Sequence, residues 1–243
     1  MTKPCSVIIP TLNEEKYLPV LLRSLNAIEA PLQIIVVDGQ SKDTTVQVAE
    51  SFTTELSTQH SLQVITTDRG ISHQRNRGTE AAAHDILLFC DADLVAPSSQ
   101  AHIDMITAFD QEGYGIATAQ IVPLENLLGA LILHKIAYCM QRLLAFWYKR
   151  AYFAGAYQIV NRSVFEQYGG YNTDLRVSED VDLSYRISEE HSFKIFPNKI
   201  KVSTRRFQKY GYSWIFANLK DVLQLTKQGK MTNNSDYYQF GDF

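Results

Sequence analysis

The sequence lacks a glycine-rich loop after its first apolar run, which counts against two classes of nucleotide-binding enzyme. Residues 10–16 read PTLNEEK, without a glycine. Sugar-phosphate nucleotidyltransferases and NAD-dependent enzymes hold phosphates on a glycine-rich turn at this place. A haloacid-dehalogenase-type phosphatase is disfavoured too, because its Asp-x-Asp pair would follow the first predicted strand. Here that pair follows the fourth, at residues 91–93.

Excess positive charge and paired cysteines are also missing. The 243 residues carry a formal net charge of -3, so binding nucleic-acid phosphates is not expected to be the main function. Cys5, Cys90 and Cys139 show neither CxxC nor Cys/His metal spacing, and we expect reduced thiols in a cytoplasmic protein. The N-terminus, MTKPCSVIIP, lacks the apolar core and cleavage site of a signal peptide.

The hydrophobic pattern predicts an α/β fold. With 45% hydrophobic and 20% charged residues, the chain is expected to form one globular domain. Short apolar runs without polar alternation are typical of strands covered on both faces; they lie at 5–10, 33–38, 62–66, 85–91 and 115–122. Helices are predicted between them, at 13–25, 41–52 and 72–83. This alternation predicts a mostly parallel, right-handed βα sheet flanked by helices.

Two details concern the helix predicted at 13–25. Thr11 and Glu14 have capping-box spacing before its apolar face. Pro19, inside the pattern, would either remove one helical hydrogen bond or mark the true first turn.

Beyond residue 123 the pattern changes. The expected order is a long helix at 124–150, a strand at 151–161, a turn at Gly169–Gly170, a helix at 178–190 with Ser178 as N-cap, two short strands at 193–197 and 201–207, and an amphipathic stretch at 214–225.

Polar residues stand where the predicted parallel strands end. They are Thr11, Asn13 and Glu14 after the first strand, Asp38 after the second, Arg69 after the third, and Asp91 and Asp93 after the fourth. Each alone could be a cap or a solvated turn. Ligands of open α/β sheets bind beyond the carboxyl ends of strands, so the common edge predicts a ligand site.

Each candidate has a chemical interpretation and a plainer alternative. Asp91 and Asp93 could hold Mg²⁺ or Mn²⁺ on a phosphorylated ligand, or form a solvated turn before a helix. Asp38 can accept a hydrogen bond from a uracil-type ring N–H. Arg75 could bind phosphate oxygens bidentately, or be an exposed helix arginine. Glu179 and Asp180 could act in a site, or only complement a helix dipole.

These residues resemble the inverting GT-A glycosyltransferases of family 2. The matching segments are SVIIPTLNEEKYLPVLLRSL (6–25), IIVVDGQSKDTT (34–45), GISHQRNRGTEAAAHDILLFCDADL (70–94) and GGYNTDLRVSEDVDLSYRI (169–187). Together they cover most of residues 5–123 and 151–190. Four motifs in this order are far more specific than Asp-x-Asp alone.

The resemblance implies one GT-A domain over residues 1–243. A Rossmann-like nucleotide-sugar half would take about 1–123, an acceptor-side half 124–210, and a C-terminal helix and tail 211–243.

The resemblance also implies roles for single residues. The nucleotide would lie against Pro10, Thr11, Leu12, Asn13, Glu14, Asp38, Arg75, Asp91 and Ala92, with Arg75 on phosphate. Asp91 and Asp93 would hold Mn²⁺ or Mg²⁺, with Asp93 the first choice for direct coordination. Asp180, beside Glu179, would be the catalytic base. Arg205 and Arg206 sit where relatives place groups near the diphosphate or acceptor, and an exposed arginine pair on an edge strand is the alternative.

The function implied is metal-dependent, inverting transfer of a sugar from a nucleotide-diphospho sugar, most simply a UDP-sugar, to an acceptor hydroxyl. A sugar-phosphate nucleotidyltransferase and a catalytically silent nucleotide-sugar-binding protein remain the alternatives.

The role of residues 124–150 stays open on the sequence. His134, Lys135 and Arg142 make a membrane span costly. A helix lying peripherally on the inner face of the cell membrane, with Trp147 near the headgroups, would suit a lipid-linked acceptor. The alternative is a helix packed on the sheet or against a second copy in a homodimer.

Overall fold

The computed structural model describes residues 2–153, 155–175 and 177–205. The strands are β1 Cys5–Thr11, β2 Leu32–Asp38, β3 Ser61–Thr66, β4 Ile86–Cys90, β5 Leu94–Val95, β6 Ile116–Pro123, β7 Tyr157–Asn161 and β8 Phe193–Val202. The helices are α1 Leu18–Asn26, α2 Thr45–Ser51, α3 Ile71–Glu80, α4 Ser99–Gln111, α5 Leu128–Tyr148, α6 Arg162–Gln167 and α7 Glu179–Ile187, with a 3-10 turn at Phe52–Thr54.

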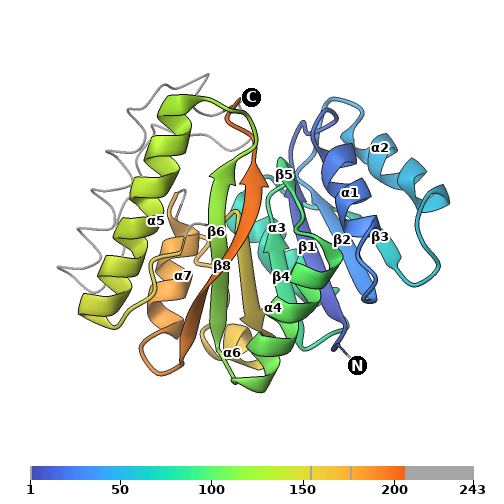
Figure 1. The fold of residues 1–243 in the computed structure, drawn as a ribbon. Helices are drawn as coiled ribbons and strands as arrows, with labels where there is room; N and C mark the ends of the chain where they lie inside the picture. Colours follow the sequence, from blue (N-terminus) through green and yellow to red (C-terminus); the bar gives the residue numbers. More distant parts are fainter. Residues whose placement is uncertain (1, 154, 176, 206–243) are drawn as a thin grey trace.

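One mixed sheet organises the molecule, in the order β3-β2-β1-β4-β7-β6-β8-β5 (Figure 1). The four strands β3, β2, β1 and β4 are mutually parallel. Then β7 runs antiparallel to β4 and β6, while β8 runs parallel to β6 and antiparallel to β5. The predicted α/β fold is confirmed, and its sheet is parallel in the first part and mixed in the second.

Helices cover both faces of this sheet because successive strand residues point to opposite sides. Val7 and Ile9 share a buried cluster with residues of α1, α2 and α4. Ile8, between them, belongs to a second cluster with residues of α6 and α7. The apolar runs without alternation therefore do mark strands buried on both faces. The edge strand β3 is the exception, because its side chains are exposed or only half-buried.

The capping box expected before the first helix does not form. Thr11 ends β1, and α1 begins only at Leu18 with Tyr17 as N-cap, which makes no side-chain cap bond. Pro19 lies in the first turn of α1, where its missing N–H costs nothing. Pro19 therefore marks the true start of the helix.

Two strand predictions in the second half were wrong in extent. The strand expected at 151–161 is restricted to Tyr157–Asn161. The two short strands expected after residue 192 are one strand, β8. Its register against β6 shifts between Phe196 and Lys199, which places Pro197 in an irregular stretch. A proline cannot donate a ladder hydrogen bond and is tolerated at such a bulge.

The long helix predicted within 124–150 is confirmed as α5, which stands beside β6 in Figure 1. Among the described residues, no helix is long and apolar enough to cross a membrane. Arg206 and the segments predicted at 211–243 lie outside the described residues.

Candidate functional site

A buried arginine joins three of the segments singled out in the sequence. Arg75, on α3, is 1% exposed. Its Nη2 donates to Asp91 Oδ1 (2.9 Å), just after β4, and its Nη1 donates to Glu179 Oε1 (2.8 Å), the first residue of α7. Nη2 also reaches the carbonyl oxygen of Gly155 (3.2 Å), and the guanidinium lies 5.0 Å from the ring centroid of Tyr171. The Asp-x-Asp and Glu-Asp motifs therefore meet at the guanidinium group of Arg75.

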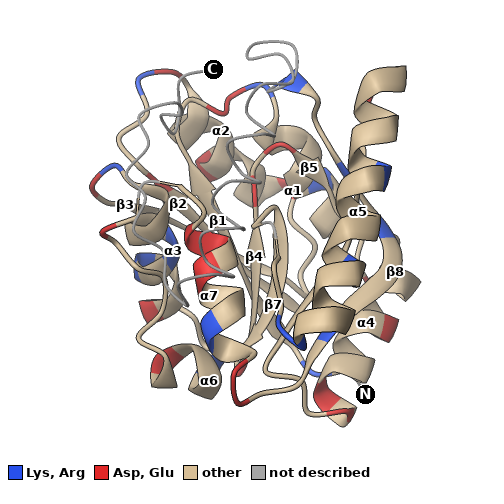
Figure 2. Ribbon diagram, turned by 90° about the vertical axis from the view of Figure 1, so that its left-hand side faces the viewer, with Lys and Arg blue, Asp and Glu red and all other residues tan. Residues whose placement is uncertain are grey.

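The start of α7 lies between α3 and β4, as the red turn in Figure 2 shows. Burial is the largest effect on Glu179 and, with the negative charge of the neighbouring Asp180, raises its pKa to about 7. The positive charge of Arg75 acts in the other direction and lowers this pKa. Burial also raises the pKa of Asp180. The backbone N–H groups of Gly155 and Val181 both donate to the Asp180 carboxylate, so its orientation is fixed from two sides.

Gln74, the neighbour of Arg75, was missed by the sequence reasoning. Its buried Nε2 donates to the carbonyl oxygens of Thr11 (2.8 Å) and Val37 (2.7 Å), at the ends of β1 and β2. A signal existed, since Gln74 and Gly78 are one helical turn apart. A Cβ on Gly78 would lie 2.4 Å from Ile8, so this face of α3 packs directly on the sheet.

Asp38 ends β2 directly opposite Thr11 in the parallel register. It is 1% exposed, and its carboxylate accepts the backbone N–H of Ser41 (2.9 Å) and the hydroxyls of Ser41 (2.5 Å) and Thr11 (3.3 Å). These bonds fix the loop after β2. They leave the proposed contact between Asp38 and a uracil-type ring a prediction.

The loop after β1 is tied to the segment that precedes α2. Asn13 has a left-handed φ of 58°, and its side-chain oxygen accepts from the N–H of Lys42 (2.9 Å). The N–H of Glu14 donates to Thr45 Oγ1 (2.7 Å). Pro10, Leu12 and Ala92 complete the predicted nucleotide wall, and all three are buried.

Arg205, which follows β8, lies at the same edge of the sheet. Its Nη1 and Nη2 donate to the two carboxylate oxygens of Glu14 (2.8 and 2.5 Å), and its Nε donates to Asp93 Oδ2 (2.9 Å). The side chain is 10% exposed and its guanidinium lies 4.5 Å from the ring centroid of Tyr17. The alternative of an exposed arginine on an edge strand is therefore wrong for Arg205, because this side chain lies between buried acids.

The acids at this edge suit a hard divalent cation held partly by its substrate. Asp91 and Asp93 are 9% and 3% exposed and supply carboxylate oxygens on either side of Ala92. No group of three or more His, Cys, Asp or Glu side chains that could hold a metal forms within the described part of the chain. Mg²⁺ typically takes one or two carboxylates together with substrate phosphates and water, so such a group is not required.

The structure thus brings together most of the predicted site residues. Glu14, Asp93 and Arg205 form one group, and Arg75, Asp91 and Glu179 form another beside Asp180. Arg69, after β3, is exposed. Arg206 lies outside the described residues. The individual roles of these residues stay predictions.

Comparison with known proteins supports the same interpretation. Residues 6–169 match the family described as Glycosyl transferase family 2. Poly(ribitol-phosphate) beta-N-acetylglucosaminyltransferase TarS from Staphylococcus aureus is 37% identical over 91 residues, which are 36% of this chain and 16% of that protein. The match therefore spans only a small part of that relative's length.

Two solved structures share the fold. The mannosyltransferase PcManGT from Pyrobaculum calidifontis, in complex with GDP-Man and Mn²⁺, has a TM-score of 0.74 at 20% identity, covering 96% of this chain and 66% of that one. Glucosyl-3-phosphoglycerate synthase from Mycobacterium tuberculosis, in complex with Mn²⁺, UDP and glucosyl-3-phosphoglycerate, has a TM-score of 0.63 at 17% identity, covering 96% and 82%. These likenesses confirm the GT-A fold.

The contacts of Arg75 predict a large loss of stability when its charge is removed. Arg75→Gln would leave Asp91 and Glu179 without their buried counter-ion, so we expect the free energy of unfolding to fall by about 3–5 kcal/mol. Arg77→Gln is the matched control, because Arg77 pairs with Glu80 at the surface of the same helix and should cost no more than about 0.5 kcal/mol. Urea denaturation measures both, and equal losses would refute the structural role of Arg75.

Proposed function

This chain belongs to glycosyl transferase family 2, and we propose that it catalyses metal-dependent, inverting transfer of a sugar from a UDP-sugar to an acceptor hydroxyl. The observation that carries the proposal is the meeting of the Asp-x-Asp and Glu-Asp motifs at Arg75. The acids proposed as cation ligand and general base thereby lie in connected segments at the carboxyl edge of the sheet, where ligands of α/β proteins bind.

Asp180 is the proposed base. Its carboxylate takes the proton of the acceptor hydroxyl while that oxygen attacks the anomeric carbon, and the bond from that carbon to the diphosphate breaks. One displacement inverts the configuration and releases the nucleoside diphosphate. The two backbone N–H groups that hold the carboxylate of Asp180 orient it for this step.

The proposed cation would be held by Asp93, with Asp91 beside it, and would be Mn²⁺ or Mg²⁺. When bound, it neutralises the charge that develops on the leaving diphosphate. Arg205, which contacts Asp93, is well placed to meet a phosphate oxygen as well. Two solved structures of the same fold were determined with Mn²⁺, one with UDP and one with GDP-Man.

The family match leaves the nucleotidyltransferase alternative without support. A catalytically silent nucleotide-sugar-binding protein would carry the same fold, so turnover separates it from an enzyme. Asp38 supports UDP because its carboxylate can accept the ring N–H of uracil, and thymine offers the same group.

Calorimetric titration of nucleoside diphosphates tests the donor class. We expect UDP to bind in the presence of Mn²⁺, more tightly than GDP, and to lose at least about tenfold in affinity with excess EDTA or in Asp93→Ala. The substitution Asp104→Ala, on the exposed side of α4, removes a carboxylate elsewhere and should change nothing. Metal-independent binding of UDP would contradict the metal site, and preferential binding of GDP would contradict the donor.

Replacement of the base should separate binding from turnover. Asp180→Asn is expected to lower the rate of sugar release from the donor by about 10²–10⁴-fold while UDP binding stays unchanged. Combined loss of nucleotide binding and turnover would show that Asp180 has another role.

The pH profile of the wild-type protein is the second readout. A base acts when ionised, and the pKa of Asp180 is raised above its ordinary value of 3.8. The rate should therefore rise with pH through a pKa above 3.8 and be lost as the pH falls through it. Because Asp180 and Glu179 interact, the apparent value belongs to the pair.

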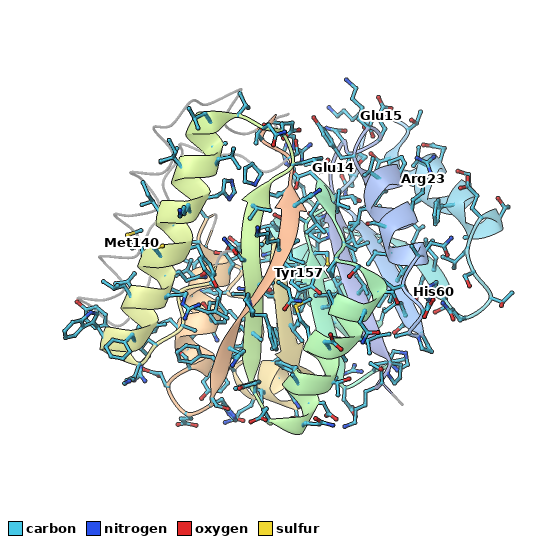
Figure 3. The ribbon with its side chains drawn as sticks, in the orientation of Figure 1. Glu14, Glu15, Arg23, His60, Met140 and Tyr157 are labelled. Atoms are coloured by element: carbon cyan, nitrogen blue, oxygen red, sulfur yellow. The ribbon has the colours of Figure 1, made fainter. Side chains whose placement is uncertain are left out.

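We further propose that the acceptor is lipid-linked and that α5 lies on a membrane surface. The outer side of α5 is apolar: Leu128, Ile132, Ile136, Met140, Leu143, Phe146 and Trp147 are exposed, and Figure 3 shows Met140 pointing away from the sheet. Lys135 and Arg142 are exposed on the same helix and Lys149 is exposed directly after it, and residues 126–150 contain no acid. Apolar side chains bordered by cations suit anionic lipid headgroups.

Vesicle sedimentation tests this surface. The protein should sediment with vesicles that contain phosphatidylglycerol and less with neutral phosphatidylcholine, and the double change Leu143→Glu/Trp147→Glu should abolish sedimentation. Val20→Glu is the matched control, because Val20 is an exposed apolar residue on α1. If the double variant sediments like the wild type, α5 is not the membrane contact.

A further inference from the structure

Arg205 contacts the carboxylate of Asp93, to which the proposed divalent cation would also bind. Its guanidinium spans Glu14, after β1, and Asp93, after β4, through three hydrogen bonds of 2.5–2.9 Å. The side chains of Glu14 and Asp93 are 4% and 1% exposed, so water screens neither charge well. Figure 3 shows Glu14 at the upper end of the sheet, the end at which β1 terminates.

Glu14 and Asp93 share the guanidinium of Arg205. Carboxylate oxygens are also the ligands that hard divalent cations take. A divalent ion on Asp93 would however lie within a few ångströms of the guanidinium that donates to the same carboxylate, and the two cations would repel each other.

The backbone that carries Arg205 is held firmly on its N-terminal side. The N–H of Ser203 donates to the carbonyl oxygen of Asp93 (2.9 Å), and the N–H of Thr204 donates to Glu125 Oε2 (2.7 Å). The main chain at these two residues is thus fixed next to Asp93. An arginine side chain has several rotatable bonds, so its guanidinium can leave Asp93 without moving those anchors.

We propose that Arg205 competes with the divalent cation for Asp93 and thereby makes binding of the cation depend on a nucleoside diphosphate. Without the diphosphate, Arg205 neutralises Asp93 and opposes the metal. With the diphosphate, phosphate oxygens offer the guanidinium other acceptors and supply the metal with further ligands. This inference rests on the metal site of the proposed function, and it assigns Arg205 to the coupling between two ligands.

The test is the affinity for Mn²⁺, measured from the electron paramagnetic resonance signal of free Mn²⁺ with and without UDP. Arg205→Gln should bind Mn²⁺ at least about tenfold more tightly than the wild type when UDP is absent. The factor by which UDP strengthens Mn²⁺ binding should shrink in this variant, and Mn²⁺ should strengthen UDP binding by the same reduced factor, because coupling is reciprocal.

Three further variants control the measurement. Asp93→Ala should lose the Mn²⁺ site. Arg23→Gln removes the same charge from the exposed side of α1 and should behave like the wild type. The double variant Glu14→Gln/Arg205→Gln removes the charge of Glu14 together with the guanidinium that contacts it, so it guards against local misfolding, and it should still bind Mn²⁺ alone more tightly than the wild type.

The outcomes separate this inference from the proposed function. If Mn²⁺ binds with UDP in every protein except Asp93→Ala, but Arg205→Gln and the double variant match the wild type without UDP, the competition is refuted and the metal site stands. If Mn²⁺ does not bind to any of the proteins even with UDP, the metal dependence is refuted and the competition with it.

Discussion

The arrangement of the candidate site depends on one buried arginine, Arg75. Arg75 contacts the carboxylate that follows β4, the first residue of α7, and the backbone at Gly155, so three segments distant in sequence are fixed to α3. The interior could not hold Asp91, Glu179 and the neighbouring Asp180 together without Arg75, because each buried charge needs a partner. Tyr171 extends the cluster, since its hydroxyl donates to Gln158, whose amide donates to the carbonyl oxygen of Asp180.

A second arginine, Arg205, divides the acids at this edge of the sheet into two groups. Arg75 is enclosed in the interior and holds Asp91 and Glu179, whereas Arg205 lies nearer the surface and holds Glu14 and Asp93. The Asp-x-Asp pair is therefore split, because its two carboxylates pair with different arginines. The inner pairing suits a permanent structural role, whereas the outer one suits the proposed exchange with a divalent cation, since Arg205 is the less enclosed side chain.

The sequence predicted the strands and their polar ends well because the apolar runs stop sharply, as at Asp38 and Asp91. It could not predict which helix arginine turns inward. Arg75 and Arg77 are two residues apart, yet one is buried and the other pairs with Glu80 at the surface. The contact of Arg205 with Asp93 joins residues 112 positions apart, and no local pattern encodes it. The capping box predicted at Thr11 was wrong, because the spacing of Thr11 and Glu14 does not reveal that Thr11 is the last residue of β1.

A further carboxylate, outside both arginine groups, fixes the segment that carries Arg205. Glu125, just before α5, accepts the N–H of Thr204 and the hydroxyl of Ser203. The N–H of Leu124 donates to the carbonyl oxygen of Val202, so the entry to α5 and the end of β8 are joined over several residues. Arg205 directly follows Thr204, so the position of the Arg205 side chain depends on the part of the molecule that carries α5. The positive charge beside Asp93 thus depends on the junction between α5 and β8 as well as on the strand ends that carry Glu14 and Asp93.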